Sequence, residues 1–328
     1  MRVSAHIVTY QSLAEIGEAL ASLGKQTFED FRVVVVDNAS SDETVEFITR
    51  EYGNRIALLR NYQNLGFAVG HNQAIQFALR TRPEFMLLMN PDVVLEYTTL
   101  AELVAAMERH PRAGVIGGRL LRPDRSTIDS TGIRARRSFW CFERGSGKPE
   151  SGNYLREEEV FGISGALALY RTDALEDIAS AHEYFDSAFF AYKEDVDVSW
   201  RLRLRGWEAW YTHRAIATHR RAARGNEQQS VRAVLAFRKL RSRAISKWSY
   251  RNHWWVIAKN LQPGLLARNF PWFFIREFAT FIYLLCMEPA TLAVLPETVR
   301  AVPRLRRQRQ AIMARARIKS RDIQRWFT

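Results

Sequence analysis

The sequence predicts an α/β protein in which helices flank a mostly parallel central sheet, followed by a helical C-terminal region. Strand-like and helix-like patterns alternate over the first 120 residues, as they do where crossover helices connect parallel strands. Two short apolar runs, 31–36 and 85–89, end directly in polar and acidic residues. With 328 residues, 47% of them hydrophobic, the chain can bury a large core and is long enough for about two domains.

The expected strands are short runs rich in Val, Ile and Leu, at residues 3–8, 33–36, 56–59, 85–89 and 115–118. The helices expected between them lie at residues 13–23, 41–52, 69–79 and 100–107. In the first helix the apolar side chains recur at the spacing of one helix face, at Leu13, Ile16, Leu20 and Leu23. This order of elements predicts a sheet with helices on both faces.

Beyond residue 120 the pattern becomes less regular. Residues 122–160 are rich in Arg, Gly and Ser and are expected to form loops and short strands over the site. A strand pattern returns at residues 160–170, a helix is expected at 194–204 and a short strand at 209–211.

The composition changes again near residue 225, which predicts an α/β domain at residues 1–225 and a C-terminal helical region at residues 226–328. The net charge of +13 follows the same division. Residues 1–218 contain 25 Lys+Arg and 30 Asp+Glu, a net charge of −5, whereas residues 219–328 contain 23 and 5, a net charge of +18. Such asymmetry indicates an anionic partner, either nucleic acid or a lipid surface.

The C-terminal region combines this basic charge with apolar and aromatic runs. A long basic helix is expected at residues 231–247, and an Arg-rich helical tail at 300–325. Aromatic side chains cluster between them, at Trp248, Tyr250, Trp254 and Trp255. The uncharged run at 278–287 is shorter than the roughly 20 residues of a membrane span, which favours an interfacial segment. Nucleic-acid binding gives no reason for apolar runs at 270–274 and 278–287, so an anionic membrane surface is the expected partner.

Cysteine usage and the N-terminus favour a cytoplasmic location. Only Cys141 and Cys286 occur, which is no disulfide framework and suggests a reducing compartment. Residues 1–8 have a strand pattern without the long apolar segment of a signal peptide. We therefore expect a cytoplasmic protein that lies peripherally on the inner face of the cell membrane.

Acidic residues follow two of the predicted strands directly. Asp37 ends the run at 33–36, and Asp92 follows Asn90-Pro91 at the end of the run at 85–89. Open α/β sheets bind ligands at the carboxyl ends of their strands, so these acids predict a site for a metal-bound or nucleotide-like ligand. The alternative is that each acid only caps the following turn or helix.

Five short motifs in one order carry a family resemblance. They are Val8-Thr9-Tyr10, Val36-Asp37-Asn38-Ala39-Ser40-Ser41-Asp42, Asn64-Leu65-Gly66-Phe67-Ala68-Val69-Gly70-His71-Asn72, Asn90-Pro91-Asp92-Val93 and Phe189-Phe190-Ala191-Tyr192-Lys193-Glu194-Asp195-Val196-Asp197. The chain resembles the family 2 inverting glycosyltransferases of GT-A fold, a Rossmann-like arrangement, and most of all their bacterial rhamnosyltransferase-like branch. The resemblance implies a nucleotide-sugar donor, a divalent metal and an acceptor hydroxyl.

The resemblance also implies which residues bind the donor. Asp37 would accept a hydrogen bond from the imide N–H of uracil or thymine, since an ionised carboxylate only accepts. The other implied donor-binding residues are Thr9, Tyr10, Gly66, Asn72, Asn90 and Asp92. Thr9 and Tyr10 can also be an ordinary strand end, and Gly66 an ordinary turn glycine.

For the metal, Asn90-Pro91-Asp92 stands where the family has Asp-x-Asp, and only Asp92 remains as a carboxylate ligand. His219 is a candidate second ligand, although a single His is as often structural. The implied ion is Mg²⁺ or Mn²⁺, and an imidazole ligand favours Mn²⁺.

For catalysis, the resemblance implies that Asp195 is the base that takes the acceptor proton and that Glu194 assists it. The alternative is that both acids only suit a helix N-terminus. Ser164 and Gly165 are expected beside the acceptor. Asp197 is expected to form a surface ion pair with Arg201 one turn later.

Together these features predict an inverting transferase that moves L-rhamnose from dTDP-L-rhamnose to a lipid-linked or polysaccharide acceptor in cell-envelope glycan synthesis. The choice of thymidine as the donor nucleoside and of rhamnose as the sugar follows from the resemblance alone, so a UDP-hexose donor stays open. A basic nucleic-acid-binding protein is the alternative from another class, although no nucleic-acid partner is expected. A nucleotidyltransferase is disfavoured because residues 9–12 lack a Gly-rich phosphate loop.

Overall fold

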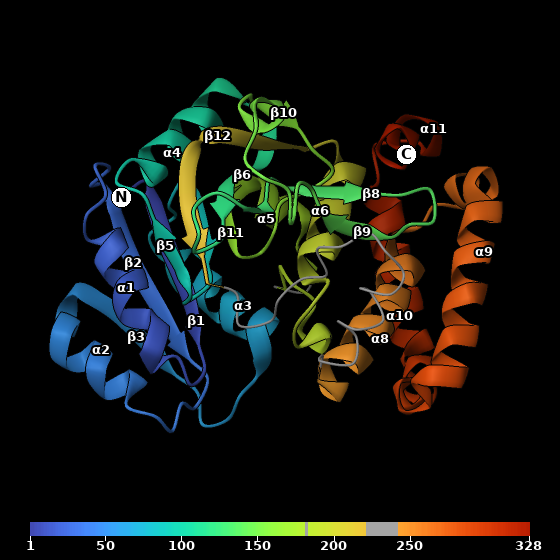
Figure 1. Ribbon diagram of the computed structural model, residues 1–328, viewed down its shortest axis with the longest axis horizontal. Helices are drawn as coiled ribbons and strands as arrows, with labels where there is room; N and C mark the ends of the chain where they lie inside the picture. The colour runs from blue at the N-terminus through green and yellow to red at the C-terminus, as the bar shows by residue number, and fades with distance from the viewer. Residues whose placement is uncertain (181–182, 221–241) are drawn as a thin grey trace.

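The computed structural model describes residues 1–180, 183–220 and 242–328, and confirms the α/β architecture with a helical C-terminal region beside it (Figure 1). The central sheet has ten strands, in the order β10-β12-β6-β11-β4-β1-β2-β3, with β5 and β7 attached to β12 and β6. Figure 1 shows the C-terminal helices α8, α9 and α10 grouped on one side of the α/β part.

The N-terminal half of the sheet is parallel. Its strands are β1 (Val3–Thr9), β2 (Phe31–Asp37), β3 (Ile56–Arg60) and β4 (Phe85–Met89). The helices between them are α1 (Leu13–Leu23), α2 (Thr44–Tyr52) and α3 (Gly66–Ala78). β1 pairs in parallel with β2 on one side and β4 on the other, so these strands end at the same edge of the sheet.

The second half makes the sheet mixed. β11 (Leu167–Arg171) lies antiparallel between β4 and β6 (Ala113–Leu121). The further strands are β5 (Val93–Leu95), β7 (Ile128–Ser130), β10 (Glu158–Glu159) and β12 (Glu208–His219), and β8 (Ile133–Ala135) with β9 (Cys141–Glu143) forms a separate ribbon. The helices are α4 (Thr99–Arg109), α5 (Thr172–Ile178) and α6 (Glu194–Arg205). The strand expected at 160–170 begins only at Leu167, because a turn closes from Leu167 N to Ser164 O.

Alternating side chains of the strands belong to two hydrophobic cores on opposite faces of the sheet. On β4, Leu87 packs with residues of α1 and α4, whereas Met86 and Leu88 pack with residues of α3, α5 and α6. Successive side chains of a strand point to opposite faces, so a fully apolar strand such as β4 is suited to burial on both. The uninterrupted apolar run at 85–89 therefore reflects a central position in the sheet.

The C-terminal helices are α8 (Arg243–Asn260), α9 (Pro263–Met287), α10 (Leu295–Arg315) and the short α11 (Ser320–Ile323). Most of the basic helix expected at 231–247, and the domain boundary expected at 225, lie outside the described residues. A third core joins these helices to α6, with Trp200 and Leu204 packed among Trp255, Leu265 and Phe327. The C-terminal region thus shares a core with the α/β part.

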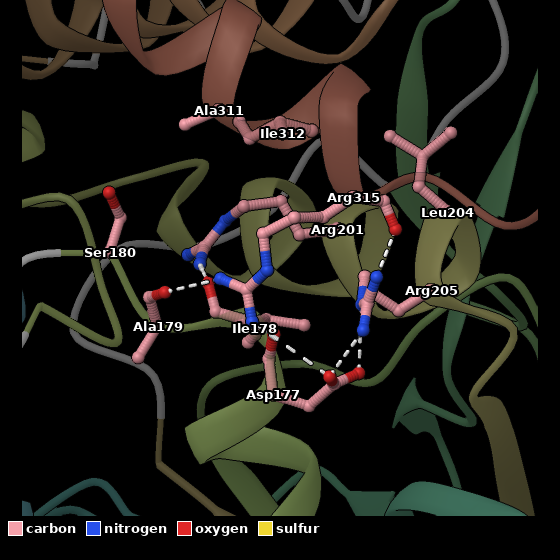
Figure 2. A pocket seen from close by; sticks show the side chains of 10 residues that line it. All are labelled: Asp177, Ile178, Ala179, Ser180, Arg201, Leu204, Arg205, Ala311, Ile312 and Arg315. Atoms are coloured by element: carbon pink, nitrogen blue, oxygen red, sulfur yellow. Dashed lines mark hydrogen bonds and ion pairs between the residues drawn. The ribbon is translucent and has the colours of Figure 1, made fainter.

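The end of α10 is fastened to the α/β part by arginines (Figure 2). The guanidinium of Arg315 donates to the backbone carbonyls of Asp177 and Ala179. Arg205, which forms an ion pair with the Asp177 carboxylate, donates to the Arg315 carbonyl. These contacts line a shallow pocket between α5, α6 and α10. They make α10 a second attachment of the C-terminal region, besides the shared core.

Helix α9 unites the two apolar runs that the sequence shows separately. It extends over 25 residues with Pro271 inside it. Within the described part of the chain it is the one helix long and apolar enough, by length and composition, to cross a membrane, and only 6% of its most apolar window is buried. It lies at the outer side of the C-terminal helices (Figure 1).

Candidate active site

The polar residues predicted for donor binding gather at the carboxyl edge of the parallel strands. Thr9 is the register partner of Asp37 on the neighbouring strand, and Ile7 pairs with Met89, one residue before Asn90. The backbone N–H of Asn90 donates to the Ala166 carbonyl at 3.0 Å, which brings the start of β11 to the same edge. The three expected clusters around residues 9, 37 and 92 are therefore neighbours.

Asp37 is buried at this edge and held by three hydrogen bonds. The Thr9 hydroxyl donates to it at 2.9 Å, and Ser40 donates from its backbone N–H at 2.9 Å and from its hydroxyl at 2.6 Å. A carboxylate has about four acceptor positions, so one remains for a ligand N–H. Tyr10 is half exposed beside this position, with 50% of its surface accessible.

The structure shows protein contacts at two of the residues predicted to bind the donor. Gly66 has a φ of +84°, and a Cβ there would lie 2.5 Å from the carbonyl oxygen of Phe190, so the absence of a side chain lets protein backbone approach here. The side chain of Asn72 is buried and used by the protein itself. It donates to the Phe185 carbonyl at 2.7 Å and accepts from the backbone N–H groups of Tyr184 and Phe185 at 3.1 and 2.9 Å. Asn72 therefore holds the segment that precedes the motif at residues 189–197.

Asp92 and His219 lie together, and a third residue orients them. His219 Nε2 is 3.2 Å from the Asp92 carboxylate, because β12 pairs with β5 directly after Asp92. The other ring nitrogen, Nδ1, is 2.8 Å from the carboxylate of the buried Asp129. The sequence did not suggest Asp129 as a site residue. It lies on the short strand β7, within the segment expected to form loops and short strands, and no distinctive motif surrounds it.

The imidazole of His219 is held between two carboxylates. Burial lowers its pKa, but the hydrogen bonds with Asp129 and Asp92 outweigh burial and raise the pKa to about 9. Over the described residues, no group of three or more His, Cys, Asp or Glu side chains is placed to hold a metal ion. A carboxylate and an imidazole are nonetheless a ligand pair that suits Mn²⁺ or Mg²⁺ when phosphate oxygens complete the shell, and a carboxylate behind the imidazole is the usual support for such a ligand.

The two acids of the last motif occupy the first turn of α6. Asp195 Oδ2 accepts from the backbone N–H of Gly165 at 3.2 Å, and Oδ1 accepts from the N–H of Val196 at 2.7 Å. Gly165 directly precedes Ala166, whose carbonyl binds Asn90, so Asp195 lies at the same sheet edge as the donor-side residues. Gly165, which is predicted to lie beside the acceptor, therefore contacts the predicted base.

Burial raises the pKa of both acids of this pair. Desolvation and the neighbouring Asp195 raise the pKa of Glu194 to about 8, and desolvation also raises the pKa of Asp195. Glu194 Oε2 is buried without a hydrogen-bond partner in the part of the chain that the structure describes. Glu194 is thus suited to be protonated at neutral pH, which relieves the repulsion between the two acids.

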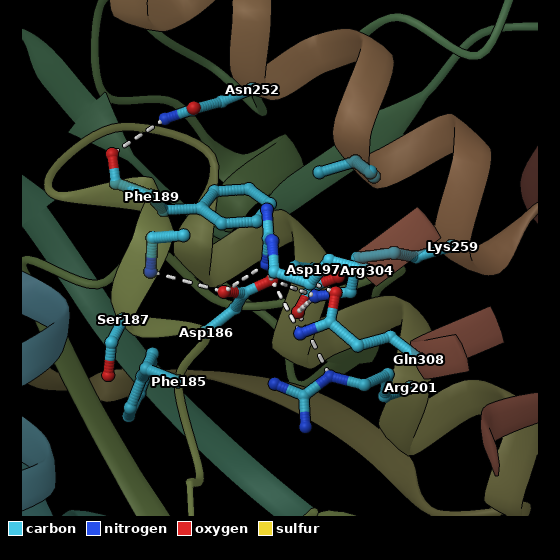
Figure 3. Close-up of polar contacts among 12 residues, drawn as sticks. Phe185, Asp186, Ser187, Phe189, Asp197, Arg201, Asn252, Lys259, Arg304 and Gln308 are labelled. Carbon is cyan, nitrogen blue, oxygen red and sulfur yellow. Dashed lines mark hydrogen bonds and ion pairs between the residues drawn. The ribbon is translucent and has the colours of Figure 1, made fainter. Parts of the chain in front are cut away.

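The pair of Asp197 with Arg201 is buried, contrary to the surface interaction expected from their spacing. Asp197 accepts from Arg201 Nε at 3.0 Å, from Lys259 Nζ at 3.0 Å and from Asn260 Nδ2 at 2.8 Å (Figure 3). Lys259 also donates to Asp186 at 2.8 Å. The reason is that α8 covers this face of α6, which the i,i+4 spacing alone does not reveal.

The sheet order, with one antiparallel strand inserted between parallel halves and polar residues at the shared edge, defines a GT-A glycosyltransferase fold. The model of the family "Glycosyl transferase family 2" matches residues 4–179, just over half of the chain, and the protein belongs to this family.

A relative and two solved structures are similar to this chain, and the likeness of the solved structures is one of fold. N-acetylglucosaminyl-diphospho-decaprenol L-rhamnosyltransferase of Mycobacterium tuberculosis is 28% identical over 239 residues, which cover 66% of this chain and 75% of that protein. The crystal structure of Staphylococcus aureus TarS 1-349 aligns with a TM-score of 0.54 at 20% identity, over 99% of this chain and 88% of that one. The mannosyltransferase PcManGT from Pyrobaculum calidifontis, in complex with GDP-Man and Mn²⁺, aligns with a TM-score of 0.53 at 18% identity, over 99% and 87%.

Proposed function

We propose that the protein transfers a sugar, with inversion, from a nucleoside diphosphate to a hydroxyl of a lipid-linked glycan. The observation that carries this proposal is the placement of Asp195. Its carboxylate is tied to Gly165 at the same sheet edge as Asp37 and Asp92, so a donor bound along that edge would present its anomeric carbon near a base.

Asp195 supplies the base that inversion needs. A direct displacement at the anomeric carbon requires that the attacking hydroxyl lose its proton to a carboxylate as the new bond forms. The raised pKa of Asp195 strengthens it as a base, and the N–H groups of Gly165 and Val196 fix its orientation. Protonated Glu194 leaves the pair with one charge instead of two.

Asp92 and His219 would hold the divalent metal, with Asp129 orienting His219. Such an ion would stabilise the charge that builds up on the departing diphosphate. Asp37 would accept a hydrogen bond from a pyrimidine base, and Thr9 and Ser40 hold its carboxylate in place.

We propose L-rhamnose, carried by dTDP, as the sugar. The support is the name of the Mycobacterium tuberculosis relative, an L-rhamnosyltransferase that acts on a diphospho-decaprenol-linked sugar. The function is tested with the full chain and Mn²⁺ against dTDP-L-rhamnose, UDP-GlcNAc and GDP-mannose. We expect the largest thermal stabilisation and the fastest metal-dependent release of nucleotide with dTDP-L-rhamnose. A clear preference for UDP-GlcNAc would replace the donor, and retention at the anomeric centre of the product, read by NMR, would contradict inversion.

Asp92→Ala should weaken donor binding only when Mn²⁺ is present, because it removes the carboxylate from the proposed pair of metal ligands, Asp92 and His219. Asp129→Asn should lower Mn²⁺ affinity by about 10–100-fold, since a neutral amide supports His219 less well than a carboxylate. Titration calorimetry with Mn²⁺ and dTDP measures both effects. The matched control is Asp124→Asn, a change of an exposed acid in the connection between β6 and β7. It should change neither donor binding nor Mn²⁺ affinity. Equal donor affinity of Asp92→Ala with and without metal would contradict this metal site.

We also propose that α9 rests on the cytoplasmic face of the membrane. Its outer face carries stacked and exposed phenylalanines at Phe270, Phe274 and Phe278, with ring centroids 5.8 and 5.9 Å apart. The charged residues of the helix centre face inward instead. Glu277 is buried and contacts His253 of α8 at 3.0 Å. A helix with an apolar outer face, whose central charged residues contact the rest of the protein, suits a position in the interface. The net charge of +18 of residues 219–328 suits anionic lipid.

The double variant Phe274→Ser/Phe278→Ser should lower binding to phosphatidylglycerol vesicles by about tenfold or more, because it removes two large side chains from the apolar face. Vesicle flotation of the full chain measures the effect. Phe142→Ser removes an exposed phenylalanine of β9 and should leave flotation unchanged. Undiminished flotation of the double variant would show that this face is not the membrane contact.

A further inference from the structure

The loop that presents Glu194 and Asp195 has an unfavourable backbone. Phe190, Tyr192 and Lys193 have φ values of +64°, +71° and +72°. None of them is glycine, and a Cβ makes this left-handed region unfavourable, so such a conformation persists only where the surroundings impose it. The contacts that impose it therefore determine where the two acids lie.

Helix α8 supplies contacts of this kind through two neighbouring side chains. Arg251 Nη2 donates to the carbonyls of Ala188 and Phe189 at 3.0 and 3.1 Å, and the fully buried Asn252 reaches further into the loop. Asn252 Nδ2 lies 3.0, 2.9 and 2.7 Å from the carbonyl oxygens of Phe189, Ala191 and Tyr192, and Figure 3 shows the amide pointing at the first of them. The orientation of the amide is set by Arg251, whose Nε donates to Asn252 Oδ1 at 3.0 Å. The nitrogen of the amide must then face the loop, where it serves backbone carbonyls that belong to no strand or helix ladder.

The opposite side of the loop is held by α3. The carbonyl of Phe190 accepts from the backbone N–H of Phe67 at 2.7 Å, and the missing side chain of Gly66 makes that approach possible. The loop is thus fixed between the start of α3 and helix α8. The family model covers α3 but does not extend to α8.

A second connection from α8 reaches the turn just after the acids. Asp197 accepts from Lys259 and Asn260 at 3.0 and 2.8 Å, and Lys259 also contacts Asp186, just before the loop (Figure 3). Asp195 therefore lies between two anchors, one at residues 189–192 and one at residue 197. Both anchors come from the same helix.

We propose that Asn252 is a positioning residue for the catalytic carboxylate, so that α8 is part of the catalytic unit as well as of the membrane-facing region. This rests on the proposed function, because the catalytic role of Asp195 belongs to it. Asn252 touches no reacting atom in this scheme. It sets the backbone of residues 189–192, and that backbone sets the direction from which α6 presents Asp195.

The test compares Asn252→Asp with Asn269→Asp in the full chain. Both are the same change at a fully buried asparagine of the C-terminal helices, but Asn269 donates to Leu265 and Gln324 and lies away from the loop. Asn252→Asp turns the donor that faces three carbonyls into an acceptor. We expect its kcat to fall about 100-fold, the effect of a small misplacement of a catalytic group, with donor KM and dTDP affinity little changed. Hydrogen exchange in peptides covering residues 186–197 should rise in this variant alone.

Asn269→Asp should change neither kcat nor the protection of residues 186–197 from hydrogen exchange. This should hold even when its melting temperature falls as much as that of Asn252→Asp. If Asn252→Asp does not fold, Asn252→Ala removes the donor without adding a charge and is measured in the same way. Unchanged exchange in residues 186–197, or equal losses of kcat in the two asparagine variants, would overturn the positioning role. Hydrogen exchange needs no sugar transfer, so a failure of the proposed function, seen as absent transfer by the unaltered chain, is distinguishable from a failure of this inference.

Discussion

Asp195→Asn is expected to lower the turnover of sugar transfer by about 10³-fold, because the variant keeps the shape of the side chain but cannot take the acceptor proton. Donor affinity should stay close to that of the unaltered chain, since the Asp195 carboxylate is held by the backbone N–H groups of Gly165 and Val196 and the proposed donor-binding acids are Asp37 and Asp92. The measurements are transfer of labelled sugar to a lipid-linked acceptor and calorimetric titration with donor and Mn²⁺.

The control for this prediction is Asp173→Asn, which makes the same change at an exposed acid in the first turn of α5. It separates a catalytic role from the favourable effect of any acid at a helix N-terminus. Rates should be compared from about pH 5 to 9, because the pKa of Glu194 is about 8 and that of Asp195 is raised, so a shifted optimum could imitate a loss at one pH. Near-normal turnover by Asp195→Asn at any of these pH values would remove Asp195 from the role of base.

Lys259→Met should destabilise the fold by about 3 kcal/mol or more, since it leaves two buried carboxylates short of a counter-charge. Lys259 contacts Asp186 at 2.8 Å and Asp197 at 3.0 Å, and the three side chains are each less than 5% exposed. Arg201 and Arg304 remain as partners and limit the loss. Denaturant unfolding measures the change, and Lys247→Met, on the same helix but outside this cluster, is the matched control.

The same cluster predicts how stability depends on pH. Burial opposes ionisation of Asp186 and Asp197, but Lys259 and the arginines beside them hold the pKa of both below the ordinary value. A carboxyl whose pKa is lower in the folded than in the unfolded state stabilises the fold above its unfolded pKa. That stabilisation is present at neutral pH and is lost as the pH falls below about 4. Lys259→Met should therefore show a weaker loss of stability in acid. An unfolding free energy equal to that of Lys247→Met at neutral pH would contradict the proposed importance of this cluster.

The parallel half of the fold and the donor side of the site follow from local patterns. The strands β1, β2 and β4 were predictable because each is a short apolar run closed by a polar residue, and parallel strands bring such ends to one edge. Thr9, Asp37 and Asp92 are neighbours for that reason. His219 is a candidate ligand only through the family resemblance, whereas Asp129, which contacts it, lies on a three-residue strand without any pattern of its own.

Other residues have contacts that their side-chain chemistry does not reveal. Gly66 and Asn72 have the residue types of a ligand site, but protein backbone takes the space beside Gly66 and the hydrogen bonds of Asn72. Asp197 and Arg201 have the spacing of a surface ion pair, and only the packing of α8 over them makes them part of a buried cluster.

By itself the sequence determined the alternation of strands and helices, the row of polar residues where the strands end, and the order of motifs that places the protein in its family. These are properties of short stretches, encoded by periodicity and by residues next to one another. The tertiary structure alone decided that helix α8 holds the loop before Asp195, through Asn252 about 60 residues further on. No local pattern could indicate this, because an amide that donates to a distant carbonyl looks the same in sequence as one that faces water.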